Sequence, residues 1–497
     1  MLLLNLDESS RTPPYQQIFL QMKDKIELQV LRPGDKLPST RKLAEQLGVH
    51  RSTVASAYQE LWAQGYIEQR HGCRPVVRER MQMATAKDRE QEGWVRWQAV
   101  TSAASVSLWE QCREMKPAGA GETGGEVIDF SSLDMDGRLF PVDHFRVCLD
   151  RALKTEGTAL LGYGDRAGYM PLREYIAGHL RSHGITITAE EILITNGLQQ
   201  GIDLVFRMLA ASGQAVAIES PTYNKIIPLL RFCGLKPLEV PVRHDGMDLT
   251  MLEEVLRREK PVLVYTMPNS QNPTGISTSQ THREQLLSLC ETYRVPILED
   301  GFEEEMKYFG KAALPIKSMD KHHLVIYAGT FSKVLFPGVR IGWIAAEREC
   351  IDRLLSIRYF SDTSSSMILQ AGIYKFCQSG HYARHINKMR RVFRSRMQTA
   401  IKAFDEYIAP DWAEWIQPSG GYLIWMKLKS PAPVRRDEWE SLMAGKGVCA
   451  AWGTLFFAGE TGESHIRLSI SKLNEQEIET GICRLGDVLR EVWNNKT

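Results

Sequence analysis

Apolar positions recur at helical spacing in the first eighty residues of the chain. Ile18, Met22, Ile26 and Val30 fall every four residues, which predicts one helix with a single apolar face, ended by a turn at residues 32–35. Two shorter helices follow: the first has Ser39 as its N-cap and Gly48 as its stop, and the second opens at residues 50–53. The predicted buried positions of these two helices are Leu43, Ala44, Leu47, Val54, Ala57, Tyr58 and Leu61. This is the spacing of a helix-turn-helix, and residues 65–72 are predicted to add a small hairpin as a wing.

A strand pattern replaces the helical one after residue 127. The runs EILITNG, QAVAIES, KPVLVYTMP, RVPILED, HLVIYAGT and VRIGWIAA are short and apolar, and the lengths between them suit crossover helices. We therefore expect an α/β fold with a largely parallel sheet.

Residues 79–126 follow neither pattern. The segment is charged at first and ends in PAGAGETGG, which favours a flexible connection. Trp94, Trp97 and Trp109 are expected to pack a short helix onto a neighbouring domain. Because 497 residues exceed the roughly 250 to 300 that one core usually holds, we divide the chain into a domain at 1–78, a linker at 79–126 and a domain at 127–497.

Composition narrows the class of protein. The chain is 43% hydrophobic and 24% charged, with no apolar run long enough for a membrane helix and no signal-peptide pattern, so we expect a soluble cytoplasmic protein without membrane contact. Nine cysteines without a CxxC pair predict reduced core thiols, and we expect no metal site.

Charge distinguishes the N-terminal domain from the rest of the chain. Residues 36–78 carry seven Lys or Arg against three Glu, although the net charge of the whole chain is only +1. Scattered basic residues usually do no more than solvate a surface. Here Arg41, Arg51 and Arg74 fall at the starts of the second and third helices and in the wing, the places that meet DNA in such domains.

Unusual polar residues in the C-terminal domain directly follow predicted strands. They are Asn196-Gly197, Glu219, Asn272, Asp300 and Lys333. Since ligands bind beyond the carboxyl ends of parallel strands, these residues predict a binding site there.

Lys333 has the neighbours that one particular cofactor requires. Alone, it would be read as a solvated surface lysine. However, Thr330, Ser332 and Arg340 surround it and suit a phosphate, and Asp300 suits a pyridinium nitrogen. Because a lysine amine forms a Schiff base with an aldehyde, the set predicts pyridoxal 5'-phosphate.

Other segments supply further parts of this site. The turn and helix start at Gly197, Leu198 and Gln199 offer backbone N–H groups to the phosphate. Tyr223 could stack on the ring or be an ordinary core tyrosine, and Asn272 offers a donor to the phenolate oxygen. Arg467 could clamp a carboxylate or be a simple ion-pair partner.

The N-terminal domain resembles the winged-helix domain of the GntR family, matching PGxxLPSxRxLAxxLGVxRxTVxxAYxxLxxxGY almost throughout. The resemblance implies that Arg41, Arg51 and Thr53 contact phosphates or base edges of double-stranded operator DNA, with His50 and Arg74 as weaker candidates. The wing reads GCRP where the family often has GSGT.

Residues 128 to about 490 resemble fold-type I aminotransferases, which have a large parallel-sheet domain and a smaller α/β domain. The matches include LGYGDxxGxxxLRxxIAxxL, TNGxQQ, ExPTY, PNxQNPTG, GTFSKxLxPGxRIGW and PSGGYLIW. The resemblance implies the following roles: Lys333 as Schiff-base lysine, Asp300 on the pyridinium nitrogen, Asn272 on the phenolate oxygen, Tyr223 on the ring, Gly197, Leu198, Gln199, Thr330, Ser332 and Arg340 on the phosphate, and Arg467 on a substrate or effector carboxylate.

Two further positions follow from this resemblance. A tyrosine like Tyr163 reaches the phosphate of the neighbouring subunit in these enzymes, which implies a homodimer. The family usually has a tyrosine two or three residues after the Asp300 position, but this chain has Phe302, which cannot donate a hydrogen bond. We expect the cofactor to bind but transamination to be poorly tuned.

A GntR-type winged helix joined to an aminotransferase-like domain resembles the MocR family. This implies a transcriptional regulator that senses pyridoxal phosphate, an amino acid or an amine. The alternative is an active aminotransferase of the 2-aminoadipate or aromatic type, and a third reading is a degenerate domain kept for dimerisation. Lys225 could hold a second acidic group of an effector, although a solvated surface lysine is the commoner case.

Overall fold

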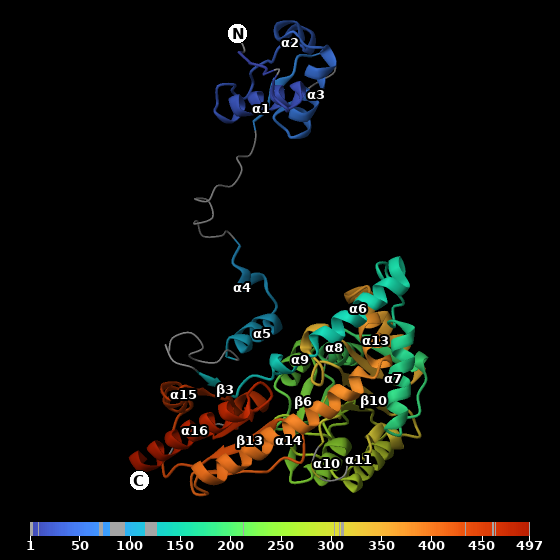
Figure 1. Ribbon diagram of the computed structural model, residues 1–497, viewed down its shortest axis with the longest axis vertical. Helices are drawn as coiled ribbons and strands as arrows, with labels where there is room; N and C mark the ends of the chain where they lie inside the picture. The colour runs from blue at the N-terminus through green and yellow to red at the C-terminus, as the bar shows by residue number, and fades with distance from the viewer. Residues whose placement is uncertain are drawn as a thin grey trace. The chain divides into compact units, whose positions relative to one another are not determined.

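The chain divides into two compact units, Met1–Val100 and Thr101–Thr497, each described by itself. The computed structural model describes residues 3–7, 9–68, 73–79, 95–114, 127–211, 213–302, 304–307, 309, 313–432, 434–459, 462 and 464–496 (Figure 1).

The first unit is a three-helix domain with a short hairpin. Its elements are α1 (Pro14–Glu27), α2 (Thr40–Leu47), α3 (Arg51–Ala63) and the antiparallel strands β1 (Ile67–Glu68) and β2 (Val76–Val77). The Ser39 side chain accepts a hydrogen bond from the Lys42 N–H, and Gly48 ends α2 at a φ of 67°, as the sequence predicted. The predicted buried stripes of α2 and α3 are confirmed, although Leu47 is only half-buried.

One expectation in this unit is wrong. Val30 was predicted to continue the apolar face of the first helix, but α1 ends at Glu27 and Val30 is 64% exposed. Val30 keeps the four-residue spacing but lies in the turn after α1, where this spacing no longer defines one face of a helix. Residues 69–72, which carry the tip of the predicted wing, lie outside the described residues.

Two short helices lie in the segment that the sequence suggested as a linker. They are α4 (Trp97–Val100) and α5 (Ala103–Glu114), and α5 packs against α9 (Ile226–Phe232) of the second unit. The expected short helix that packs on a neighbouring element is present as α5, although Trp97 and Trp109 are 73% and 53% exposed. Trp94 and the stretches 80–94 and 115–126 lie outside the described residues.

The centre of the second unit is an eight-stranded sheet in the order β4-β11-β10-β9-β8-β5-β6-β7. Strands β10, β9, β8, β5 and β6 are parallel neighbours, whereas β11 is antiparallel to β10 and to β4, and β7 is antiparallel to β6. The strands span Ile192–Thr195 (β4), Ala215–Ser220 (β5), Lys236–Arg243 (β6), Gly246–Met247 (β7), Leu263–Thr266 (β8), Ile297–Asp300 (β9), Val325–Thr330 (β10) and Gly342–Ala345 (β11).

All six predicted strands form, because each is an apolar run that the sheet buries. The expectation of crossover helices fails between β10 and β11, which are joined by the short stretch 331–341 and run antiparallel. This stretch carries Lys333 and Arg340, so the reversal folds them back over the end of the sheet.

Helices cover the sheet, as Figure 1 shows for α7, α8, α10 and α11. The helices around it are α6 (Val142–Glu156), α7 (Met170–Ser182), α8 (Leu198–Leu209), α9 (Ile226–Phe232), α10 (Leu249–Arg258), α11 (Gln280–Tyr293), α12 (Arg348–Ser361) and α13 (Met367–Gln378). α6 packs closely along α13, and α8 packs against β11 and α12.

A smaller α/β part completes the second unit. Its antiparallel sheet has the order β12 (Ala413–Trp415), β13 (Leu423–Leu428), β16 (His465–Ser469) and β15 (Ala451–Trp452), and β14 (Val448–Cys449) pairs in parallel with β3 (Ile128–Asp129). The long helix α14 (His381–Tyr407) packs against α16 (Glu475–Lys496), and α15 (Arg436–Gly445) lies beside β14. The chain therefore has the predicted large sheet domain and smaller α/β part.

Composition led to expectations about membrane helices and about cysteines. None of the helices in the described part of the chain has the length and apolar character needed to cross a membrane. The nine cysteines are free thiols, but only Cys148, Cys290 and Cys377 are buried, and Cys73 and Cys112 are exposed, so the prediction of core thiols holds for part of the set.

Candidate functional site

A cavity of about 150 Å³ opens beyond the carboxyl ends of the parallel strands. The polar residues that follow β4, β8, β9 and β10 meet here because parallel strands all end at one edge of the sheet. The cavity is lined by Leu133, Leu198, Gln199, Tyr223, Lys225, Met267, Asn272, Asp300, Phe302, Thr330, Ser332, Lys333 and Arg340. The sequence-predicted site residues in this list are thus brought together from segments up to 140 residues apart.

Lys333 lies in the turn that follows β10. Its side chain is half-buried, and its Nζ donates a hydrogen bond to the main-chain oxygen of Leu133, 3.0 Å away. The amine therefore lies in the wall of the cavity, with the Leu133 carbonyl as an acceptor. A lysine amine in this position can form a covalent bond to an aldehyde.

Asp300 is the last residue of β9 and is only 1% exposed. Its Oδ2 accepts a hydrogen bond of 2.7 Å from the Tyr265 hydroxyl, and its Oδ1 accepts one of 3.1 Å from the Phe302 N–H. Burial raises the pKa of Asp300 to about 7 despite these two hydrogen bonds. A buried carboxyl of this kind gains most from a cationic partner, such as a protonated ring nitrogen.

The turn between β4 and α8 approaches Arg340 very closely. Gly197 has a φ of 85°, and a Cβ at this position would lie 2.7 Å from Nη2 of Arg340. Nη2 also donates a 3.1 Å hydrogen bond to the main-chain oxygen of Asn196. The positive end of α8 and the Arg340 guanidinium are thus adjacent, which is an arrangement that binds phosphate.

Ser332 provides a test of whether a phosphate fits this cradle. It is 5% exposed, and its Oγ has no hydrogen-bond partner among the described residues. A buried hydroxyl without a partner is costly, so its presence beside Arg340 is consistent with a ligand oxygen at this point. Thr330 differs, because its Oγ1 donates to the Ile341 oxygen at 3.2 Å and accepts from the Ser332 N–H at 3.0 Å, which stabilises the turn itself.

Asn272 and Arg467 contact each other at the side of the site. Nη1 of Arg467 donates to Oδ1 of Asn272 over 3.3 Å, and its Nη2 donates to the main-chain oxygen of Ser131. This contact aims the amide nitrogen of Asn272 away from the guanidinium. Tyr223 completes the wall, and burial together with the Asp300 carboxyl raises the pKa of its hydroxyl.

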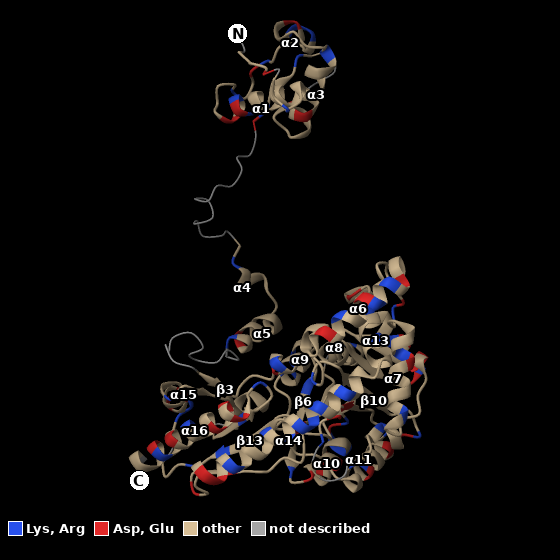
Figure 2. Ribbon diagram, viewed as in Figure 1, with Lys and Arg blue, Asp and Glu red and all other residues tan. Residues whose placement is uncertain are grey.

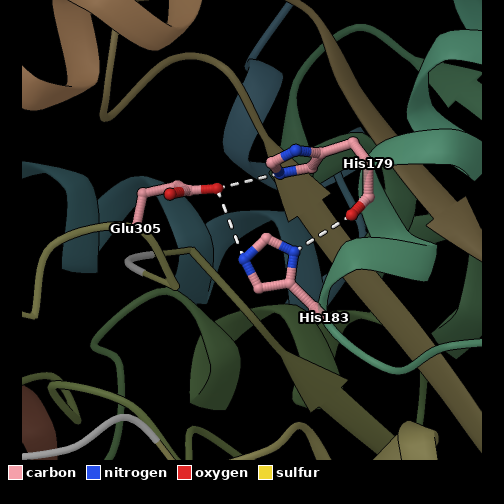
Figure 3. Close-up of side chains that lie close together, drawn as sticks. All are labelled: His179, His183 and Glu305. Carbon is pink, nitrogen blue, oxygen red and sulfur yellow. Dashed lines mark hydrogen bonds and ion pairs between the residues drawn. The ribbon is translucent and has the colours of Figure 1, made fainter.

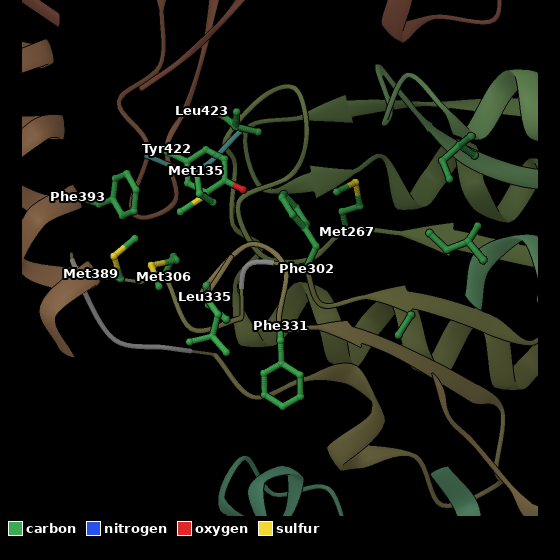
Figure 4. Close-up of a cluster of buried hydrophobic side chains, with 14 of the residues drawn as sticks. Met135, Met267, Phe302, Met306, Phe331, Leu335, Met389, Phe393, Tyr422 and Leu423 are labelled. Atoms are coloured by element: carbon green, nitrogen blue, oxygen red, sulfur yellow. The ribbon is translucent and has the colours of Figure 1, made fainter. Parts of the chain in front are cut away.

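Phe302 lies two residues after Asp300, at the position where the sequence led us to expect a missing hydroxyl donor. It is 6% exposed and lines the cavity. Figure 4 shows its ring beside Met267 within the buried hydrophobic cluster. This part of the wall is therefore apolar and offers no donor from the ring.

Tyr163 stands apart from the other predicted residues. It lies in the loop after α6 and is 88% exposed, and it does not line the cavity of its own chain. A role at this cavity would require Tyr163 of a second copy.

Sequence reasoning missed three residues that shape the site. Tyr265 donates to Asp300, the Leu133 carbonyl accepts from Lys333, and Met267 lines the wall. Tyr265 looked like one more apolar strand residue, and Leu133 acts through its backbone, which leaves no side-chain signal in a sequence.

The predicted DNA-contacting residues of the first unit lie at the helix starts. Arg41 is in the first turn of α2, His50 caps α3, and Arg51 and Thr53 are in the first turn of α3. Nε of Arg51 donates to Oγ1 of Thr40 over 3.3 Å, which joins the two helix starts. Arg41, His50, Arg51 and Arg74 are exposed and Thr53 is half-buried, and Figure 2 shows basic positions on α2.

Comparison with protein families assigns both parts of the chain. The aminotransferase class I and II family matches residues 126–485, and the gntR family of bacterial regulatory proteins matches residues 14–77. The chain therefore belongs to the aminotransferase class I and II family and carries a GntR winged helix at its N-terminal side.

Relatives with the same two-part organisation define the family more narrowly. The chain is 31% identical to the uncharacterised HTH-type transcriptional regulator YdfD of Bacillus subtilis, over 97% of both chains. It is 30% identical to the probable rhizopine catabolism regulatory protein MocR of Rhizobium meliloti, over 82% of this chain and 80% of that protein. The chain is thus a member of the MocR-type family of helix-turn-helix regulators.

A solved structure matches the second unit. The α-aminoadipate aminotransferase LysN of Thermus thermophilus, complexed with N-(5'-phosphopyridoxyl)-L-leucine, has a TM-score of 0.73 and 29% identity, covering 80% of this chain and 99% of that one. The family and the cavity agree on pyridoxal 5'-phosphate as the cofactor.

Proposed function

We propose that this protein is a DNA-binding transcriptional regulator whose aminotransferase-like domain senses pyridoxal phosphate and an amino acid or amine effector. The observation that carries the proposal is the presence in one chain of a winged helix with exposed arginines at the starts of α2 and α3 and a cavity lined by Lys333, Asp300 and Arg340. An enzyme alone does not need a winged helix, and a simple repressor does not need a cofactor cavity.

In this proposal the cavity residues hold the cofactor and admit one ligand. Bound pyridoxal phosphate supplies an aldehyde that reacts reversibly with amines. Lys333 would be the residue that holds the cofactor covalently, and Asp300 would lie against its ring nitrogen. Ser332, Arg340 and the turn at residues 197–199 bind the phosphate, Asn272 and Tyr223 contact the ring, and Arg467 binds the effector carboxylate.

The active form in this proposal is a cytoplasmic homodimer. Tyr163 supports it, because a tyrosine that is 88% exposed, in a family whose cofactor site draws on two subunits, suits contact with the neighbouring cavity. A dimer also presents two winged helices to the two halves of an operator.

A second candidate function is an active aminotransferase. The presence of Asn272 in the cavity wall, as in the aminotransferases that the chain resembles, favours it. Phe302 argues against efficient catalysis, because the wall beside Asp300 lacks a hydroxyl donor.

The test measures DNA affinity and chemistry on the same full-length protein. Binding to a duplex selected from a random pool is measured for the cofactor-free, cofactor-loaded and effector-saturated forms, while the absorption of the bound cofactor is followed across a panel of amino acids and amines. The proposal expects one ligand to change both the spectrum and the DNA affinity. Equal DNA affinity in all three states would exclude it, and steady accumulation of keto acid would favour the enzyme.

A further inference from the structure

Three metal-ligating side chains converge at a place that the proposed function does not use. His179 lies in the last turn of α7, His183 is the residue that caps this helix, and Glu305 lies in the loop after β9. Figure 3 shows both imidazole rings turned toward the same carboxylate oxygen. Nε2 of His179 lies 2.8 Å and Nε2 of His183 lies 3.6 Å from Oε1 of Glu305, and all three ligand atoms fall within 4.8 Å of one another.

These separations suit a small divalent ion. Zn²⁺ binds imidazole nitrogen and carboxylate oxygen at about 2.0 to 2.2 Å in tetrahedral geometry, which places neighbouring ligand atoms about 3.3 Å apart. The spacing of four residues puts both histidines on one face of the helix. Small rotations of the rings are sufficient to surround an ion at the centre of the cluster.

The hydrogen bond at the rear of His183 fixes which nitrogen faces the cluster as a ligand. Its Nδ1 lies 3.1 Å from the main-chain oxygen of His179, which can only accept, so Nδ1 carries the proton. In the neutral ring Nε2 then presents a lone pair toward Glu305, whose Oε1 is also an acceptor. A second proton on the ring or a metal ion between the two atoms makes this contact favourable, and a backbone contact at Nδ1 is the usual support of a metal-bound histidine.

The surroundings leave room for the ion and hold the carboxylate in place. Arg390 donates from Nη2 to Oε2 of Glu305 over 2.8 Å and from Nε to its main-chain oxygen over 2.7 Å. Arg390 therefore occupies the far side of the carboxylate and leaves Oε1 to the histidines. A cavity of about 20 Å³ adjoins the cluster, lined among others by His179, His183, Glu305 and Tyr382, which is enough for one water as a fourth ligand.

The geometry points to a binding site for one divalent transition-metal ion at His179, His183 and Glu305, with Zn²⁺ as the ion of choice for this ligand set. Imidazole ligands favour Zn²⁺ and its neighbours over Mg²⁺ and Ca²⁺. The ion would connect α7 to the loop that begins directly after Asp300, so it stabilises the floor of the cofactor cavity without taking part in chemistry. The inference does not depend on the proposed function.

The experiment uses the full-length protein after removal of metals with a chelator. Zn²⁺ and, separately, Mg²⁺ are titrated by calorimetry into the wild type, His183→Gln and the control His322→Gln, which changes an exposed histidine outside the cluster. We expect one Zn²⁺ per chain for the wild type and the control, at least a 100-fold loss of affinity in His183→Gln, and no comparable binding of Mg²⁺.

A second measurement separates loss of the site from loss of the fold. The midpoint of thermal unfolding should rise with Zn²⁺ for the wild type and His322→Gln but stay constant for His183→Gln, while circular dichroism and cofactor absorption remain those of the wild type. Equal Zn²⁺ affinity in wild type and His183→Gln, or no binding in either, would show that the cluster is only a hydrogen-bonded ion pair with Arg390 and would overturn the inference.

Discussion

Some residues of the cavity can be predicted from residue type and position in the sequence, and others cannot. Lys333 and Asp300 could be placed in advance because each follows a strand and each has chemistry that few other ligands need. Tyr265 could not, since nothing in a strand sequence says which aromatic hydroxyl will reach a carboxyl 35 positions away. The His179, His183 and Glu305 cluster escaped for the same reason: the expectation of no metal site came from cysteine spacing, and Glu305 reaches α7 only through the tertiary fold.

The raised pKa of Asp300 makes a pH-dependent prediction about the cofactor-free protein. An ordinary aspartate has a pKa near 4, whereas the pKa of Asp300 is about 7. Between pH values of about 4 and 7, Asp300 is therefore protonated to a greater extent in the folded chain than in the unfolded chain. The free energy of unfolding then falls as pH rises from about 4 to 7, by up to about 1.4 kcal/mol per pH unit. Asp300→Asn removes this contribution.

Urea unfolding of both proteins across this range measures the effect. The stability advantage of the wild type over Asp300→Asn should shrink steadily with pH, while Asp411→Asn, at an exposed position, should show no such trend. A difference between wild type and Asp300→Asn that does not vary with pH would contradict the prediction. Asp300→Asn should also weaken cofactor binding, since its amide cannot pair with a protonated ring nitrogen.

Phe302 offers a gain-of-function prediction. Phe302→Tyr adds a hydroxyl to a wall that lacks a ring donor, and one such hydrogen bond contributes on the order of 1 kcal/mol. We expect keto acid formation from the best amine ligand to rise about five-fold, with an altered spectrum of the bound cofactor. Tyr223→Phe is the matched comparison, because it removes a hydroxyl from another residue that lines the cavity. Unchanged chemistry in Phe302→Tyr would mean that position 302 does not limit the reaction.

At the scale of elements, apolar runs predicted strands well wherever the sheet buries both faces. The missed strand β6 reads KPLEVPVR, in which Pro237 and Pro241 argue against a strand. In the described sheet β7 pairs only with Val242 and Arg243, so the remainder of the outer edge of β6 has no neighbouring strand there. A strand with such an edge tolerates proline, which is why β6 can form. A short packed helix around Trp109 was expected, and α5 is that helix, but its bounds could not be read from the sequence because its packing on α9 and not its own periodicity supports it.

The turn between β4 and α8 provides a prediction about an element. Gly197 adopts a φ of 85° and ψ of 164°, a region almost restricted to glycine, where another residue costs about 1 to 3 kcal/mol. In Gly197→Ala the new methyl group also meets Arg340. We expect cofactor affinity to fall at least ten-fold, measured by absorption titration. Gly213→Ala, at a φ of 84° with open space around it, should leave that affinity unchanged.

At the scale of the whole molecule, the sequence predicted two functional parts correctly because each has a dense motif of its own. The boundaries of the linker were harder to predict. The two compact units divide after Val100, within the segment suggested as a linker, because α5 belongs by its packing to the second unit. Composition cannot reveal this packing. The sequence on either side of α5 is rich in glycine and charged residues, and α5 itself is stabilised by its contact with α9.

The last prediction concerns the independence of the two units. Arg51→Ala removes an exposed charge from the start of α3, so DNA affinity should fall for all sequences and the slope of affinity against salt should decrease by about one. The absorption of the bound cofactor should stay as in the wild type. Lys333→Ala should do the reverse: it should keep basal DNA binding but lose the response of that binding to the effector. Arg11→Ala, an exposed arginine ahead of α1, is the control for charge alone. If Lys333→Ala responded to effector like the wild type, the covalent step at Lys333 would not be the signal that reaches the DNA-binding unit.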